Sequence, residues 1–320
     1  MTMRVQDFVM GCCVLTGMVL LGCANPPPPA PVLAPSPGPL TAQVESLRRQ
    51  GGRWLTKGDM TRAEEAYESA RRMAESLDDV KGLIETLNDL GNVAMSRGAT
   101  ARAVTLHGRA VALARRVEDP RLLIESLTAA GAAEHREGRL QEAERLDQQA
   151  LDLAIQTTDR SAEAVLRNNL GLLLHAKGDG EQAERFFRQA MVLNQASGDA
   201  AAEASNHVNL GILAEGRRDR EAAEREFERA LELDKAAERR SEIAADLSRL
   251  GQLAERGGLL DRALVYFERA YRSYLAQGNV TEAMSALTHA VACAGKAGRM
   301  EDVARLEKEL SGVGSQGAGQ

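Results

Sequence analysis

The sequence is poor in the residues that build disulfide frameworks, aromatic cores and nucleic-acid-binding surfaces. Only four of its 320 residues are cysteine and 3% are aromatic, although 44% are hydrophobic. The core must therefore consist mainly of Ala, Leu and Val. The net charge of -6 lacks the positive excess that binding to nucleic acid requires, so no nucleic-acid partner is predicted. Charged residues reach 27% and the mean hydropathy is -0.30, which excludes a protein with many membrane-spanning segments.

An uncharged stretch of fifteen residues occupies positions 8–22. It is shorter than the roughly 20 residues that span a bilayer and is typical of the apolar part of a secretory signal peptide. The stretch runs into LLGC at residues 20–23, which resembles the lipobox of bacterial lipoproteins. That resemblance implies lipidation of the Cys23 thiol and removal of a signal peptide at residues 1–22. An uncleaved anchor or a wrongly assigned start remains the alternative.

The residue after Cys23 is Ala24 instead of the Asp that retains many lipoproteins at the inner membrane. By resemblance, this favours a lipid-anchored protein of the outer membrane of a Gram-negative bacterium, with its body in the periplasm, and surface display stays open. Cys12 and Cys13 leave with the signal peptide, so Cys293 is the remaining thiol. We expect no intramolecular disulfide, despite the oxidising compartment, and a buried, unreactive Cys293.

Eight of the nine prolines lie between Pro26 and Pro39. Such a segment favours the polyproline II conformation and acts as a semi-rigid spacer of about 3.1 Å per residue. Residues 23–40 are therefore predicted to be a linker, and a proline-rich ligand for another domain is the alternative. At the other end, residues 312–320 show no periodicity and are predicted to form a disordered tail.

Small residues recur every 40 residues along the rest of the chain. One glycine column consists of Gly51, Gly91, Gly131, Gly171, Gly211 and Gly251. A second column, seven residues later, consists of Gly58, Gly98, Gly138, Gly178, Arg218, Gly258 and Gly298. Alanine columns begin at Ala63 and Ala70, and a column of larger residues contains Tyr67, His107, Asp147, Phe187, Phe227 and Phe267. Chance does not produce this regularity.

Each repeat has the pattern of two helices. In the fourth repeat, one helical face carries Leu166, Leu170, Leu173 and Leu174, and a second carries Ala183, Phe186, Phe187 and Ala190. Asp79, Asp119, Asp159 and Asp199 stand where their side chains can cap the first helix of a repeat. Pro120 follows one of these caps, at a first-turn position that tolerates proline. Without any strand signal, the predicted fold is all-α.

The placement of Gly171, Gly178, Ala183, Phe187 and Ala190 resembles the tetratricopeptide repeat. The resemblance covers residues 41–311, or about seven helix pairs, of which the first and last are degraded. The period of 40 residues resembles the longer repeats of the bacterial and kinesin-light-chain type. It implies an α-solenoid, a superhelix in which each pair buries its apolar face only when stacked on the next.

No residues form a convincing catalytic or metal site. HExxH, GxSxG and CxxC are missing, and the GxGxxA match at residues 178–183 follows a predicted helix instead of a strand. His135 and His175 occupy equivalent positions in adjacent repeats. Helices that pack 8–10 Å apart hold such imidazoles too far apart for a shared zinc ion. We therefore predict no enzymatic activity, no cofactor, no metal and no small-molecule substrate.

In tetratricopeptide proteins the first helices line a concave groove that holds a peptide. Carried over to this sequence, the groove residues are Asn88, Asn92, Asn168, Asn169, Asn209, Arg249 and Gln252. Amide side chains both donate and accept hydrogen bonds, which suits the gripping of a peptide backbone, although a merely solvated surface is the alternative. The groove is also predicted to be polarised, with Glu45, Glu85 and Glu125 at one end and Arg249, Arg256 and Lys296 at the other.

The predicted fold and the predicted location together indicate a membrane-anchored scaffold that binds a segment of an envelope protein. Envelope lipoproteins of this architecture include pilotins and adaptors for peptidoglycan hydrolases, and this analogy rests on fold and location alone. The alternative is a structural protein that self-associates through its repeats and holds no peptide. Whether the segment would be extended or helical stays open.

Overall fold

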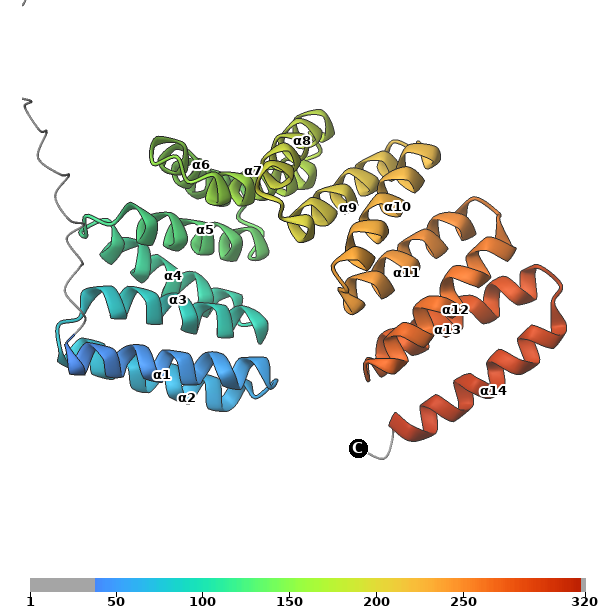
Figure 1. Cartoon of the computed structure of the whole chain (residues 1–320), viewed down its shortest axis with the longest axis horizontal. Coiled ribbons are helices and arrows are strands. Elements are labelled where there is room, and N and C mark those ends of the chain that lie inside the picture. Colours follow the sequence, from blue (N-terminus) through green and yellow to red (C-terminus); the bar gives the residue numbers. More distant parts are fainter. Residues whose placement is uncertain (1–37, 318–320) are drawn as a thin grey trace, which may run out of the picture. The chain divides into compact units, whose positions relative to one another are not determined.

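The computed structural model describes residues 38–317, which contain fourteen α-helices and no strand (Figure 1). In chain order they are α1 (Pro39–Thr56), α2 (Met60–Ser76), α3 (Val80–Ser96), α4 (Thr100–Ala114), α5 (Pro120–Arg136), α6 (Leu140–Gln156), α7 (Arg160–Ala176), α8 (Gly180–Ser197), α9 (Ala200–Gly216), α10 (Arg220–Ala236), α11 (Arg240–Arg256), α12 (Leu260–Ala276), α13 (Val280–Lys296) and α14 (Met300–Gly317). The all-α prediction is confirmed, as are the seven helix pairs.

The helices stack in chain order. Each packs against the helix before it and the helix after it, across connections of two to five residues. The odd-numbered helices are the first helices of the repeats, and α1, α3, α5, α7 and α9 also contact one another in succession. The exposed surface of the odd-numbered helices is called the first-helix face below. This arrangement is the predicted α-solenoid.

Helix starts and turns follow the chemistry of the repeat columns. The carboxylates of Asp79, Asp159 and Asp199 each accept a hydrogen bond from the backbone N–H three residues later, at 2.9–3.0 Å. In the second glycine column the six glycines have φ between 73° and 86°, and Arg218 takes the same left-handed conformation with φ of 61°. The column is glycine because L-residues with a side chain rarely adopt this conformation.

The first glycine column lies where the two helices of a repeat cross. A β-carbon on Gly171 would lie 2.5 Å from Cε1 of Phe187, and one on Gly211 would lie 2.5 Å from Cε1 of Phe227. Both rings are buried. The aromatic side chain of the second helix thus occupies the space that a side chain on the first helix would need, as the small-residue columns predict.

The ends of the array differ from the predicted boundaries. Helix α1 begins at Pro39, and α14 continues to Gly317, so residues 312–317 are helical where a disordered tail is predicted. The predicted signal peptide, Cys23 and most of the proline-rich linker lie outside the described residues. Between residues 38 and 317, no helix combines the length and the apolar character that crossing a bilayer requires.

Candidate functional site

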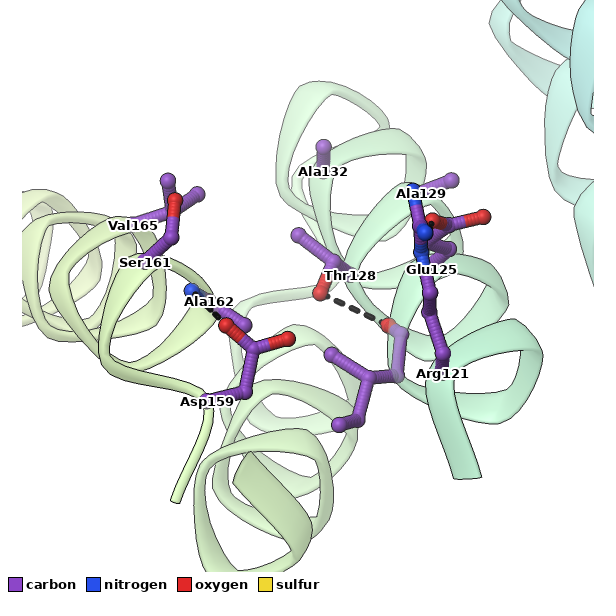
Figure 2. Close-up of a pocket in the computed structure, with 10 residues that line it drawn as sticks. Arg121, Glu125, Thr128, Ala129, Ala132, Asp159, Ser161, Ala162 and Val165 are labelled. Atoms are coloured by element: carbon purple, nitrogen blue, oxygen red, sulfur yellow. Dashed lines mark hydrogen bonds and ion pairs between the residues drawn. The ribbon is translucent and has the colours of Figure 1, made fainter. Parts of the chain in front are cut away.

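A cavity of 640 Å³ opens on the first-helix face between α5 and α7. Figure 2 shows the lining side chains of α5 on one side and those of α7 and its cap on the other. The cavity is lined by Arg121, Ile124, Glu125, Thr128, Ala129, Ala132, Asp159, Ser161, Ala162 and Val165. This cavity is called the α5/α7 groove. Its size lies within the range of about 300–1,000 Å³ that is usual for ligand sites.

The α5/α7 groove offers apolar surface between polar groups that already have partners. Val165 is 49% exposed, although it is a large apolar residue. Arg121 donates to Glu125 at 2.9 Å, and the hydroxyl of Thr128 donates to a backbone carbonyl of its own helix at 2.8 Å. The Asp159 carboxylate accepts from the backbone N–H of Ala162. Small residues make up most of the remaining lining, so a ligand backbone could approach both helices closely.

The other neighbouring first helices are joined by side-chain hydrogen bonds or ion pairs. The bonds are Arg48 to Asp89 between α1 and α3, Asn88 to Ser126 between α3 and α5, Asn209 to Asn168 between α7 and α9, Arg256 to Glu215 between α9 and α11, and Lys296 to Glu255 between α11 and α13. Within residues 38–317 no such bond joins α5 to α7. The surface between these two helices is therefore not crossed by any side-chain bond of the described residues.

Two of the predicted groove asparagines hold neighbouring repeats together. The Oδ1 atom of Asn168 accepts from Nδ2 of Asn206 at 3.1 Å and from Nδ2 of Asn209 at 2.8 Å. Asn206 in turn accepts from Nδ2 of Asn194, on α8, at 2.7 Å. This network spans α7, α8 and α9. Asn168 and Asn209 lie on the predicted face, but their amides serve the packing of the array.

Asn88 has a similar structural role. Its Nδ2 donates to the hydroxyl of Ser126 at 3.0 Å, and its Oδ1 lies 3.2 Å from Nδ1 of His107. Burial lowers the pKa of His107 to about 4, so the ring is neutral at ordinary pH and its Nδ1–H can donate to Asn88. Asn88 therefore joins α3 to both α4 and α5.

The side chains of Asn92, Asn169 and Gln252 make no hydrogen bond to any other residue in the described part of the chain. Asn92 and Gln252 are exposed, and Asn169 is half-buried. These three amides lie on α3, α7 and α11 and do not line the α5/α7 groove, and their role in binding a ligand stays a prediction.

The predicted charge polarity of the groove is wrong, because the charges are paired locally. Each of the six residues bonds to an opposite charge on its own or a neighbouring helix: Glu45 to Arg49, Glu85 to Arg48, Glu125 to Arg121, Arg249 to Asp246, Arg256 to Glu215, and Lys296 to Glu255. Neither end therefore presents a row of unpaired charges of one sign.

Arg249 lines a second cavity on the first-helix face, which we name the α9/α11 pocket. Its volume is 240 Å³, and it is lined by Ala204, Ser205, Val208, Asn209, Asp234, Arg239, Glu242, Ala245, Asp246 and Arg249. Nη1 of Arg249 donates to Oδ1 of Asp246 at 2.8 Å. This pocket is smaller than the α5/α7 groove and far more charged.

Three buried aspartates were not among the site residues predicted from the sequence. Asp147, Asp234 and Asp246 are at most 2% exposed, and one oxygen each of Asp147 and Asp246 is buried without a hydrogen-bond partner. Burial raises the pKa of Asp147 to about 7. The signal in the sequence was a charged residue in a column where most of the other repeats carry uncharged residues. Asp147 replaces an aromatic residue, and Asp234 and Asp246 stand one repeat after Asn194 and Asn206.

The potential metal ligands of the described residues are scattered, and the one described thiol is buried. In that part of the chain, no group of three or more His, Cys, Asp or Glu side chains could hold a metal ion. Cys293 is buried, as predicted, and burial raises its pKa to about 11. Its thiol is therefore protonated and unreactive at physiological pH.

Stacked helix pairs, with glycine at the crossing of six of the seven described pairs, define the class of α-helical repeat proteins. The tetratricopeptide-repeat family model matches residues 82–156, 122–196 and 161–236. The chain belongs to the tetratricopeptide-repeat family. No curated protein sequence matches it significantly.

Several solved structures have a similar fold. BtubC (BKLC) from P. vanneervenii is 22% identical with a TM-score of 0.58, and the match covers 76% of this chain and 93% of that one. A Rap protein complexed with Competence and Sporulation Factor is 14% identical with a TM-score of 0.63, covering 86% and 75%. Aspartyl phosphate phosphatase F from Bacillus subtilis is 10% identical with a TM-score of 0.64, covering 86% and 70%. At these identities the similarity extends to the fold alone.

Proposed function

We propose that this protein is a non-enzymatic scaffold, anchored to the outer membrane by a lipid on Cys23, that binds a segment of another envelope protein in the α5/α7 groove. The observation that carries the binding site is the unbridged space of 640 Å³ between two first helices, in an array whose other first helices are bonded together. The family supports a role in binding other proteins. The anchor rests on residues 20–23 of the sequence.

The chemistry of the groove suits a segment with small or apolar side chains. Val165 supplies apolar contact, and Ala129, Ala132 and Ala162 leave room for a close backbone. The polar groups at its edge already bond to other residues of this chain. They would therefore hold the walls of the groove in place more than they would select a ligand by its charge. The Rap protein complexed with Competence and Sporulation Factor supports the proposal, since a protein of similar fold is there in complex with a partner.

A photo-crosslinking amino acid tests the groove in living cells. When it replaces Val165, we expect ultraviolet light to join the protein to one envelope protein, because this side chain lies in the groove and is half exposed. The matched control replaces Val192, which is 60% exposed on the second helix α8 and does not line the groove. The adduct is identified by mass spectrometry.

Ala132→Arg provides the complementary test. Its long charged side chain should fill the groove from the α5 side and reduce the adduct at residue 165 at least about tenfold, which corresponds to about 1.4 kcal/mol of binding. Equal capture from residues 165 and 192, or capture that Ala132→Arg leaves unchanged, would place the partner elsewhere. Crosslinks at residue 165 only to a second copy of the chain would favour the self-associating alternative.

Cys23→Ala tests the anchor. Without a thiol at residue 23 no diacylglycerol can be attached, so we expect the protein to leave the membrane fraction and to incorporate no radiolabelled palmitate. Two or more buried acyl chains provide stable anchoring, at about 0.8 kcal/mol per CH₂ group. Cys293→Ala is the control, because this thiol is buried inside the array. Membrane attachment that survives Cys23→Ala would contradict a lipid anchor at this residue.

A further inference from the structure

Two buried aspartates meet where α10 packs against α11. Asp234, near the end of α10, is 2% exposed, and Asp246, in the middle of α11, is 1% exposed. Asp234 accepts from Nη1 of Arg239 at 3.1 Å, and Asp246 accepts from Nη1 of Arg249 at 2.8 Å. The other oxygen of Asp246 is buried and no donor points at it. A buried carboxylate oxygen without a donor is costly, so this atom requires an explanation.

The preceding repeat contains the same pair as asparagines. Asn194 and Asn206 stand 40 residues before Asp234 and Asp246, and Nδ2 of Asn194 donates to Oδ1 of Asn206 at 2.7 Å. An amide can donate and accept, whereas an ionised carboxylate can only accept. The aspartates can therefore form the equivalent bond only if one of them carries a proton.

We propose that Asp234 and Asp246 share one proton, and that this proton forms a pH-sensitive bond between the fifth and sixth repeats. The unpartnered oxygen of Asp246 then becomes an O–H that donates to the Asp234 carboxylate, as the asparagine amide does one repeat earlier. Loss of the proton leaves two buried carboxylates facing each other. We call this contact between α10 and α11 the joint. Its packing is thus more stable at mildly acidic pH than above neutral pH.

The surrounding charges are consistent with a single shared proton. Arg239 and Arg249 act on the pair from the N-cap and the middle of α11, and Glu242, also on α11, adds negative charge. From α9, the pocket receives the neutral side chains of Ser205 and Asn209. Burial, with the Asp234 carboxylate, raises the pKa of Asp246 to about 7 against the attraction of Arg249.

The direction of the pH effect follows from that shift. The folded state holds the proton more tightly than the unfolded chain does, so the bond contributes fully below pH 4 and is lost as the pH rises through about 7. Both carboxyls also line the α9/α11 pocket, so loss of the proton adds one negative charge to the wall of this pocket. The inference concerns the joint itself and holds whether or not the α5/α7 groove binds a protein.

Hydrogen exchange of the full-length chain in detergent, at pH 5.5 and pH 8.5, tests the joint without any ligand. After correction for the intrinsic pH dependence, we expect amides of α10 and α11 to lose protection at least about tenfold at the higher pH, relative to α8 and α9. The double variant Asp234→Asn/Asp246→Asn should abolish this loss. Equal protection at both pH values in the unmodified protein, or a loss that persists in the double variant, would overturn the proposal.

The reciprocal variant Asn194→Asp/Asn206→Asp should transfer the pH dependence to α8 and α9. A carboxyl ¹³C titration of the unmodified protein gives an independent result that needs no variant to fold. We expect Asp246 to titrate above pH 6, whereas a midpoint near pH 4 would show that no proton is shared.

Discussion

Gly171→Leu should lower the free energy of unfolding of the array by about 3 kcal/mol, at the upper end of the usual cost of overpacking a core. A β-carbon at this position would lie 2.5 Å from Cε1 and 2.7 Å from Cδ1 of Phe187, a ring that is 1% exposed. The ring cannot move aside, because it is enclosed with Ala183, Leu174 and Leu210 in one cluster of buried residues. The two helices must therefore separate to admit the larger side chain.

Gly108→Leu is the matched control. Gly108 is exposed in the middle of α4, and a β-carbon there would have no heavy atom within 4 Å. Leucine favours the helix over glycine by up to about 1 kcal/mol, so this variant should be as stable as the unmodified protein or slightly more stable. Urea unfolding followed by circular dichroism compares the two variants. A Gly171→Leu protein as stable as the Gly108→Leu protein would contradict the close-packing role of the glycine column.

Sequence periodicity predicts the helices and their crossings because each column has one physical requirement that is met in every repeat. Gly171 and Gly211 admit an aromatic ring, and Gly178 adopts a left-handed turn. Arg218 has the same turn conformation without being glycine, which shows that the column holds even where the best residue is missing. These requirements are local or lie within one helix pair. Comparing positions 40 residues apart in this one sequence is therefore sufficient to find them.

The side-chain partners across the first-helix face could not be predicted in this way. Asn168 and Asn209 are predicted on the correct face, but they bond to each other because residues 41 positions apart on neighbouring first helices lie side by side. Whether such an amide is free or bonded depends on which side chain the next repeat supplies, and this varies between repeats. The α5/α7 groove exists because α7 carries no partner there for α5, a feature that no single column displays.

Asp147 is the clearest departure from the repeat pattern and supports a prediction with a large effect. It replaces the aromatic residue of its column, is 2% exposed, and lies against Gly131, with Oδ1 buried and without a hydrogen-bond partner. Burial raises its pKa from 3.8 to about 7. The fold therefore binds this proton more tightly than the unfolded chain, and stability is lost as the pH rises from about 4 through about 7.

Asp147→Asn should remove that loss. A pKa raised by about three units means that ionised Asp147 lowers the stability of the fold by about 4 kcal/mol above pH 7. The amide introduced by Asp147→Asn would be buried without a partner and would itself cost about 1–3 kcal/mol, so the net gain is smaller. The isosteric variant should therefore be about 2 kcal/mol more stable than the unmodified protein at pH 8 and no more stable at pH 4.5. Comparing the two proteins at each pH cancels the contribution of Asp246, which both retain.

Asp152→Asn, on the exposed side of the same helix, is the control and should change stability equally at both pH values. Urea unfolding at pH 4.5 and pH 8 measures all three proteins. A stability gain for Asp147→Asn that is the same at both pH values would mean that Asp147 neither gains nor loses a proton between pH 4.5 and pH 8, and would contradict this prediction. A gain confined to pH 8 ties the cost to the charge itself, because the two side chains have the same shape and differ only in their ability to ionise.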